Sequence, residues 1–104
     1  MKEIEEEKPN IILSYELSVV NDLQDTYEYG KLYLIGHRNR FWKCAFHCPC
    51  GCGELLELLL LKEVSPHWSI EFSDESHVNI YPSIWKSKGC KSHFFIRSNR
   101  IIWV

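Results

Sequence analysis

The chain has 104 residues, of which 45% are hydrophobic, and this size suits one domain with a single modest core. A formal net charge of −2 provides no broad cationic field, so the sequence argues against nucleic acid as a partner. The segment MKEIEEEKPN lacks the apolar stretch of a secretory signal, and no run has the length of a membrane span. We therefore predict a cytoplasmic protein without membrane association, with residues 1–10 as a flexible acidic N-terminus and residues 11–104 as one folded domain.

The first half of the chain has the pattern of strands joined by turns. Residues 11–20 alternate between apolar and polar side chains, which predicts a half-buried strand with one apolar face: Leu13, Tyr15, Leu17 and Val19. A polar loop ending in Gly30 precedes an apolar run over residues 31–35. A turn over residues 36–40 then leads into residues 41–47, and these two runs together predict a hairpin.

The second half continues the same pattern. Residues 54–64, ELLELLLLKEV, favour helix by their Leu and Glu content, but their length and position between turns favour a buried strand, which we predict. Alternation over residues 68–72, a turn at 73–76 and a return run at 78–80 predict a second hairpin. A loop is expected over residues 81–89, followed by a last hairpin that joins 94–96 to 101–104. The predicted fold is therefore a small, all-β, mainly antiparallel single domain.

The strongest local signal is the segment HCPCGCG at residues 47–53, which places three of the five cysteines at alternate positions. A disulfide between such near neighbours would close a strained ring, and clustered thiols in a reducing compartment point to a metal ion. The glycines allow the backbone to bend round an ion, and Pro49 stiffens the turn, as in a zinc knuckle. Cys90 and His93 provide a second half-site, whereas Cys44, alone on its strand, is more typical of a core residue.

The residues leave two ligand sets open for one tetrahedral ion. Either the three knuckle thiols bind with Cys90 and leave His93 free, or two knuckle thiols bind with Cys90 and His93 and leave one thiol nearby. Zinc is the expected ion because thiolates and imidazole suit it, with iron as the alternative. If no metal binds, the cysteines are reduced core residues that act as small hydrophobic side chains.

Serine and histidine residues near the second half-site suggest hydrolytic chemistry. A serine becomes a nucleophile when a base within hydrogen-bond reach accepts its proton, and His93 can be that base if it is not a ligand. Adjacent residues of a strand point to opposite faces, so Ser83 is a better partner for His93 than Ser92 is. Both serines can instead cap turns, and a zinc-bound water with Glu54 or Glu57 as base is a competing mechanism.

The remaining histidines and tryptophans have simpler interpretations. His37, His67 and His77 lie in predicted turns or on exposed faces, and we expect them at the surface. Trp85 lies in the predicted loop and is a candidate contact for a partner. We expect the other tryptophans in the core: Trp42, Trp68 and Trp103.

Several motifs occur in a fixed order along the chain. They are CPCGCG at 48–53, an alternating W-x-I-x-F strand at 68–72, PSIW at 82–85, GCKSHFFIR at 89–97 and R-I-I-W at 100–103. On these motifs, residues 29–104 resemble a bacterial family of small domains of unknown function with CPCGCG, PSI and C-x-S-H signatures. This family occurs beside E1-like, E2-like and ubiquitin-like proteins in defence-associated conjugation operons. It often has His or Arg before the PSI motif and Gly-Asn-Trp after it, where this chain has Tyr81 and Trp85-Lys86-Ser87.

The resemblance implies a metal-stabilised peptidase that trims a ubiquitin-like precursor or removes it from targets by serine and histidine chemistry. It implies that one zinc ion is held by four matching cysteines: Cys48, Cys50, Cys52 and Cys90. The matching polar set, which we take as the candidate catalytic residues, is Ser83, Ser92 and His93. The implied partners are a ubiquitin-like protein or its conjugates, together with E1-like or E2-like proteins.

Two other functions compete with this hypothesis. In one, a non-catalytic zinc module docks onto an E1-like or E2-like partner through an edge strand and the Trp85 loop. In the other, a zinc ribbon binds nucleic acid through basic residues near the C-terminus, which the overall acidity disfavours: Lys86, Lys88, Lys91, Arg97 and Arg100.

Overall fold

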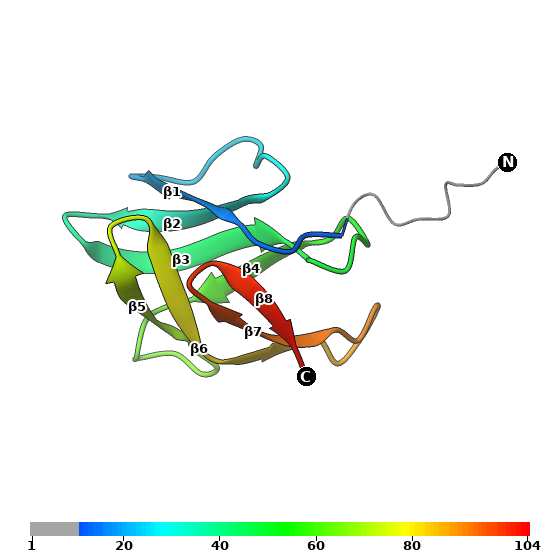
Figure 1. Ribbon diagram of the computed structural model, residues 1–104. Coiled ribbons are helices and arrows are strands. Elements are labelled where there is room, and N and C mark those ends of the chain that lie inside the picture. The colour runs from blue at the N-terminus through cyan, green and yellow to red at the C-terminus, as the bar shows by residue number, and fades with distance from the viewer. Residues whose placement is uncertain (1–10) are drawn as a thin grey trace, which may run out of the picture.

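The computed structural model describes residues 11–104, so the predicted flexible acidic N-terminus lies outside the described residues. Two four-stranded sheets pack as two layers, and this confirms the predicted all-β single domain (Figure 1). The first sheet contains β1 (Glu16–Val20), β2 (Lys31–His37), β3 (Arg40–His47) and β4 (Leu55–Leu59). The second contains β5 (Ser69–Asp74), β6 (His77–Trp85), β7 (His93–Arg97) and β8 (Arg100–Trp103). Over the described range, no helix has the length and apolar character needed to cross a membrane.

The leucine-rich segment after the cysteine turn is a strand, as predicted. Within β4, Leu56 and Leu58 are buried while Glu57 is exposed, which is the period-two pattern of a strand with one face on the core. β4 pairs antiparallel with β3 and aligns Glu57 with Ala45. Packing of the two leucines against the core therefore outweighs the helix propensity of the segment.

The first predicted strand is only partly correct. Strand β1 begins at Glu16 and pairs parallel with β2, whereas the residues before it contact the second sheet through a bridge between Ser14 and Arg100. Because the segment passes from one sheet to the other, its alternation does not define one continuous face. The prediction of one apolar face is wrong, since Leu13 and Val19 are exposed.

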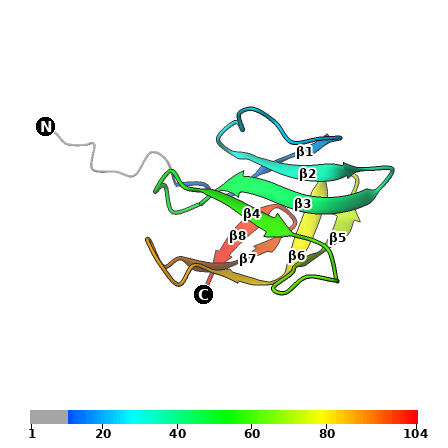
Figure 2. The same ribbon diagram turned by 180° about the vertical axis from the view of Figure 1, so that it is seen from behind.

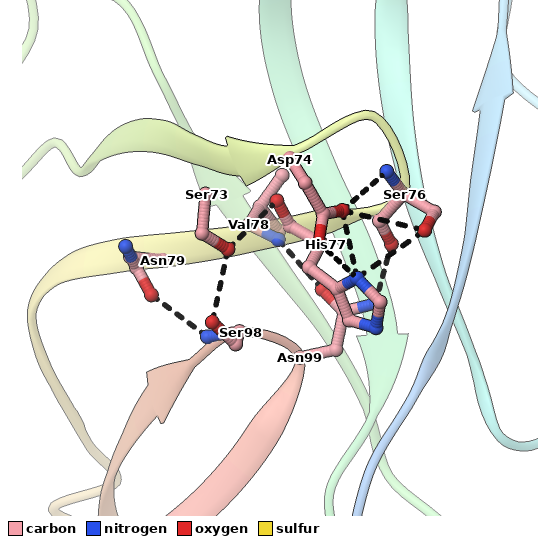
Figure 3. Close-up of polar contacts among 8 residues, drawn as sticks. All are labelled: Ser73, Asp74, Ser76, His77, Val78, Asn79, Ser98 and Asn99. Atoms are coloured by element: carbon pink, nitrogen blue, oxygen red, sulfur yellow. Dashed lines mark hydrogen bonds and ion pairs between the residues drawn. The ribbon is translucent and has the colours of Figure 1, made fainter.

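The predicted last hairpin is confirmed, and its turn is tied to the turn before β6. Ser98 and Asn99 both have positive φ, as a tight two-residue hairpin turn requires. The buried Asn99 side chain accepts a hydrogen bond from the Val78 amide at 2.8 Å and donates one to the Ser76 carbonyl at 2.9 Å. Figure 3 shows these two turns side by side. One amide side chain thus joins both hairpins of the second sheet.

The PSI motif lies in strand β6, which corrects the prediction of a loop over residues 81–89. The pairs Ile80↔Ile96 and Ile84↔Phe94 bracket three residues on β6 and one on β7, so residues 81–83 form a bulge. Pro82 suggested a loop because proline has no N–H to donate a hydrogen bond to a neighbouring strand. In a bulge, however, its position lies outside the regular strand pairing. The connection between the strands is consequently shorter than predicted, and it begins after Trp85.

The core lies between the two sheets and depends on a few aromatic rings. The fully buried Phe46 of β3 lies with its ring centroid 5.2 Å from that of Tyr15 and 6.5 Å from that of Phe94 in β7. Both contacts have the edge-to-face geometry that aromatic pairs prefer. Phe46 therefore connects the two layers.

Replacing Phe46 should consequently destabilise the whole domain. We expect Phe46→Ala to lower the free energy of unfolding by about 3–5 kcal/mol, because it leaves a cavity between the sheets. Phe72→Ala, at a ring that is 42% exposed, should cost about 1 kcal/mol or less. Denaturant unfolding monitored by circular dichroism would measure both values, and equal losses would contradict the assigned position of the core.

Candidate active site and sulfur cluster

Ser83 and His93 face each other across neighbouring strands. The distance between Ser83 Oγ and His93 Nε2 is 2.9 Å, which is a hydrogen bond. Ser83 belongs to the β6 bulge and His93 begins β7. Both side chains are half-buried, so they combine fixed positions with access from solvent. This is the geometry of a nucleophile beside a base.

The bulge that carries Ser83 is held in place by a tryptophan. The Trp68 indole nitrogen donates a hydrogen bond of 3.3 Å to the Ser83 carbonyl oxygen. Bulges often redirect a side chain next to a functional site, and here the bulge aims Ser83 at the first residue of the partner strand. Trp68 packs against the core, as expected, but its contact with the Ser83 carbonyl has no signal in the sequence.

Four cysteine sulfurs gather at one end of the molecule. The Sγ atoms of Cys48, Cys50, Cys52 and Cys90 all lie within 4.8 Å of one another, and none is in a disulfide. Cys48 Sγ lies 3.5 Å from Cys50 Sγ and 3.6 Å from Cys90 Sγ. A tetrahedral ion with bonds of about 2.3 Å to sulfur would space its ligands roughly 3.8 Å apart. The cluster can therefore hold one metal ion.

The composition of the cluster matches the first of the two ligand sets that the sequence left open. Within residues 11–104, the group that can hold a metal consists of the four cysteines and does not include His93. Cys44 is fully buried in the core, as predicted. His93 thus remains available to Ser83.

Ser92 lies at the sulfur cluster. It is buried, and its Oγ lies 3.1 Å from Cys90 Sγ and 3.8 Å from Cys48 Sγ. Burial raises the pKa of the Cys48 thiol to about 12. At Cys90 desolvation also raises the pKa, but hydrogen bonds from the Ser92 side chain and backbone, together with those from the Cys50 and Cys48 thiols, outweigh it and lower the pKa to about 6. The Ser92 hydroxyl therefore stabilises negative charge on sulfur.

The connection between β6 and β7 is closed against the cysteine turn. The Lys86 amide donates to the Ser92 carbonyl at 2.8 Å, and the Lys86 ammonium forms an ion pair with Glu54. Figure 2 shows the two loops side by side, the connection in orange and the cysteine turn in green, as Figure 1 does from the opposite side. Cys90 in the connection completes the sulfur group of Cys48, Cys50 and Cys52. The position of His93 is therefore coupled to the cluster.

A second group of Ser, His and Asp side chains lies in the turn before β6. His77 Nδ1 is 2.8 Å from Asp74 Oδ1 and 3.2 Å from Ser76 Oγ (Figure 3). A catalytic triad requires the acid and the nucleophile on opposite ring nitrogens, whereas here both approach the same one. The hydrogen bond from His77 instead lowers the pKa of the Asp74 carboxyl. This group has the arrangement of a polar turn.

A cleft of about 790 Å³ lies between the start of β3 and strand β5, apart from the Ser83–His93 pair and the sulfur cluster. Phe41, Leu60, Ile70 and Phe72 supply its apolar lining, and neither Ser83 nor His93 is among its lining residues. The size of this cleft is therefore not evidence that it is the active site. The residues that could carry out a reaction lie where β6 and β7 meet the cysteine turn.

Comparison with known families bears on these residues directly. Residues 19–104 match the model of a family described as bacterial ubiquitination-like system serine protease (BubE). The chain belongs to the BubE family. The matched range contains the four cysteines together with Ser83 and His93, and the predicted family resemblance is confirmed. Among curated proteins and among solved structures, no chain matches this one.

Membership of the BubE family gives the Ser83–His93 hydrogen bond a chemical context. The family description specifies a serine protease of a ubiquitination-like system, and a reactive serine requires a neighbouring base. Of the candidate serines, Ser83 lies beside His93 and Ser92 lies beside the sulfurs. The roles of the three residues in catalysis remain predictions.

Proposed function

We propose that this BubE protein is a serine peptidase that processes a ubiquitin-like protein or removes it from its conjugates. The observation that carries the proposal is the 2.9 Å contact between Ser83 Oγ and His93 Nε2 in a chain of a serine protease family. In the proposed assignment Ser83 is the nucleophile and His93 is the general base. Ser92 is a hydrogen-bond partner of the sulfurs and takes no direct part.

The reaction follows from these two groups. Ser83 Oγ attacks the carbonyl carbon of the scissile bond while His93 Nε2 accepts the hydroxyl proton, which requires the imidazole proton on Nδ1. The tetrahedral intermediate collapses, the C–N bond breaks, and His93 returns the proton to the leaving amine. Water then hydrolyses the acyl-enzyme by the same proton transfers, which releases the carboxylate and regenerates Ser83.

The four cysteines would hold one zinc ion with a structural role. A complete set of four thiolates leaves no open coordination position, which is typical of structural zinc. The ion would stabilise the fold near the active site. The competing mechanism through Glu54 or Glu57 has little support, because these side chains form ion pairs with Lys86 and Lys43.

The family context also supports the proposed partners. A ubiquitination-like system contains a ubiquitin-like protein, which is the proposed substrate, and E1-like or E2-like proteins, which are proposed associates in defence against phage. Reduced thiols that bind zinc favour a reducing compartment, so we place the protein in the cytoplasm. The alternative of a non-catalytic module predicts saturable binding to the E1-like or E2-like protein without a cleaved product.

Removal of the nucleophile tests the proposed reaction. The substrate is a ubiquitin-like protein of the same conjugation system with a C-terminal peptide extension, and cleavage is followed by mass spectrometry. Ser83→Ala and His93→Gln should each reduce cleavage to the background rate, a loss on the order of 10⁶ for removal of such a group. A fluorophosphonate probe should label the native protein and fail to label Ser83→Ala.

Matched controls separate these roles from general damage. Ser87→Ala changes an exposed serine in the neighbouring connection, and His77→Ala changes the histidine of the polar turn. Both variants should cleave at the native rate. Full cleavage by folded Ser83→Ala would remove the serine mechanism, and absence of any product from the native protein would favour the binding module.

Zinc content can be tested with cysteine variants. Native protein should contain one zinc per chain by metal analysis and native mass spectrometry, and Cys52→Ala should lose it. We expect the thermal midpoint to fall by about 10 °C or more, because a metal that binds only the folded state adds directly to stability. Cys44→Ala removes a thiol outside the cluster and should keep its zinc. Full zinc retention by Cys52→Ala would contradict the four-cysteine site.

A further inference from the structure

Within residues 11–104, the His93 ring is not paired with the carboxylate that usually accompanies a catalytic histidine. In known triads a carboxylate hydrogen-bonds the second ring nitrogen and fixes the orientation of the imidazole. In the described part of this chain, no carboxylate forms a hydrogen bond or ion pair with His93. A base that can rotate away from its serine is inefficient, so the site needs another way to hold the ring.

Trp85 lies directly against this ring. It is the cross-strand partner of His93 in the pairing of β6 with β7. The two ring centroids are 5.1 Å apart, and the ring planes are inclined by only 14°. The Phe95 ring lies 6.5 Å from His93 at 32°, which adds a second aromatic neighbour on the same strand. The imidazole is thus bounded by aromatic surfaces.

The exposure of Trp85 indicates that core packing does not account for its position. The side chain is 69% exposed, although a tryptophan in a small soluble domain usually buries most of its surface. Ser83 and Trp85 are two residues apart on β6, on the face that also presents His93. The contact that the indole makes with the candidate base therefore accounts for its position better than core packing does.

We infer that Trp85 is a positioning residue, which holds the His93 imidazole by stacking so that Nε2 stays directed at Ser83 Oγ. The inference rests on the proposed serine mechanism. A flat ring parallel to the imidazole allows sliding but opposes rotation about the Cβ–Cγ bond, because rotation would drive the ring edge into the indole. Stacking in this way supplies the orientation that a carboxylate supplies elsewhere.

A kinetic comparison tests the inference. Trp85→Ala should lower kcat for cleavage of the extended ubiquitin-like protein by about 10²-fold, which is the usual cost of a small misplacement of a catalytic group. KM should change by less than about threefold, since the interaction that is lost serves the transition state. Trp85→Phe keeps a flat ring and should recover most of the native kcat. Leu13→Ala, which removes another exposed apolar side chain, should have no effect.

A substrate-binding role for Trp85 would give a different pattern. In that case KM would rise and kcat would stay near the native value, which would overturn the inference. The rate of fluorophosphonate labelling gives a second comparison, because this small probe does not need the binding surface for a protein substrate. Labelling should slow in Trp85→Ala and recover in Trp85→Phe, and an unchanged rate in Trp85→Ala would also contradict positioning.

A measurement without catalysis separates this inference from the proposed function. In the Ser83→Ala background, the ring protons of His93 should show upfield NMR shifts from the indole ring current, and Trp85→Ala should abolish them. Unchanged shifts would contradict the stacking. If Ser83→Ala still cleaves, the proposed mechanism fails. If Ser83 is required but Trp85→Ala keeps its native kcat, only the positioning role fails.

Discussion

The closure of the β6–β7 connection against the cysteine turn is the constraint on which the candidate site depends. Cys90 lies three residues before His93, and its sulfur belongs to the group formed with Cys48, Cys50 and Cys52. Ser92, between them, has its hydroxyl near two sulfurs and its carbonyl bonded to the Lys86 amide. Each of these contacts limits the freedom of the chain immediately before the histidine. Restraint of the backbone on this side favours a lasting hydrogen bond between Ser83 and His93.

The candidate site is built on strands, which explains how so small a domain can hold the Ser83 and His93 side chains in fixed relative positions. The β6 bulge moves Ser83 out of the regular ladder, while the Trp68 indole fixes its carbonyl from the neighbouring strand region. On the other strand, the pairing of His93 with Trp85 places an aromatic ring over the imidazole. Groups on rigid elements keep their geometry better than groups on loops. The bulge provides the local irregularity that a loop would otherwise have to supply.

The sequence predicted the fold class and the sulfur group better than it predicted how the strands are arranged around them. Period-two alternation identified β5, and the spacing of the cysteines identified the sulfur group, because both are local patterns. The bulge was missed since Pro82 reads as a loop signal until its partner strand is known. The crossing of residues 11–15 to the second sheet was missed for the same reason, as alternation does not specify which sheet receives a strand. Long-range register, which places Trp85 on His93, has no local signal at all.

The composition of the sulfur group and the choice of a serine mechanism are physically linked. Four thiolates satisfy a tetrahedral ion completely, so such an ion has no position left for a water or a substrate carbonyl. In the proposed mechanism, hydrolysis therefore depends on protein side chains, and the Ser83–His93 pair near the cluster can supply a nucleophile and a base. Had His93 been a ligand, the pair would not exist. In the proposed arrangement, a fourth cysteine at position 90 thus leaves the histidine free for chemistry, while the same cysteine restrains the chain that carries it.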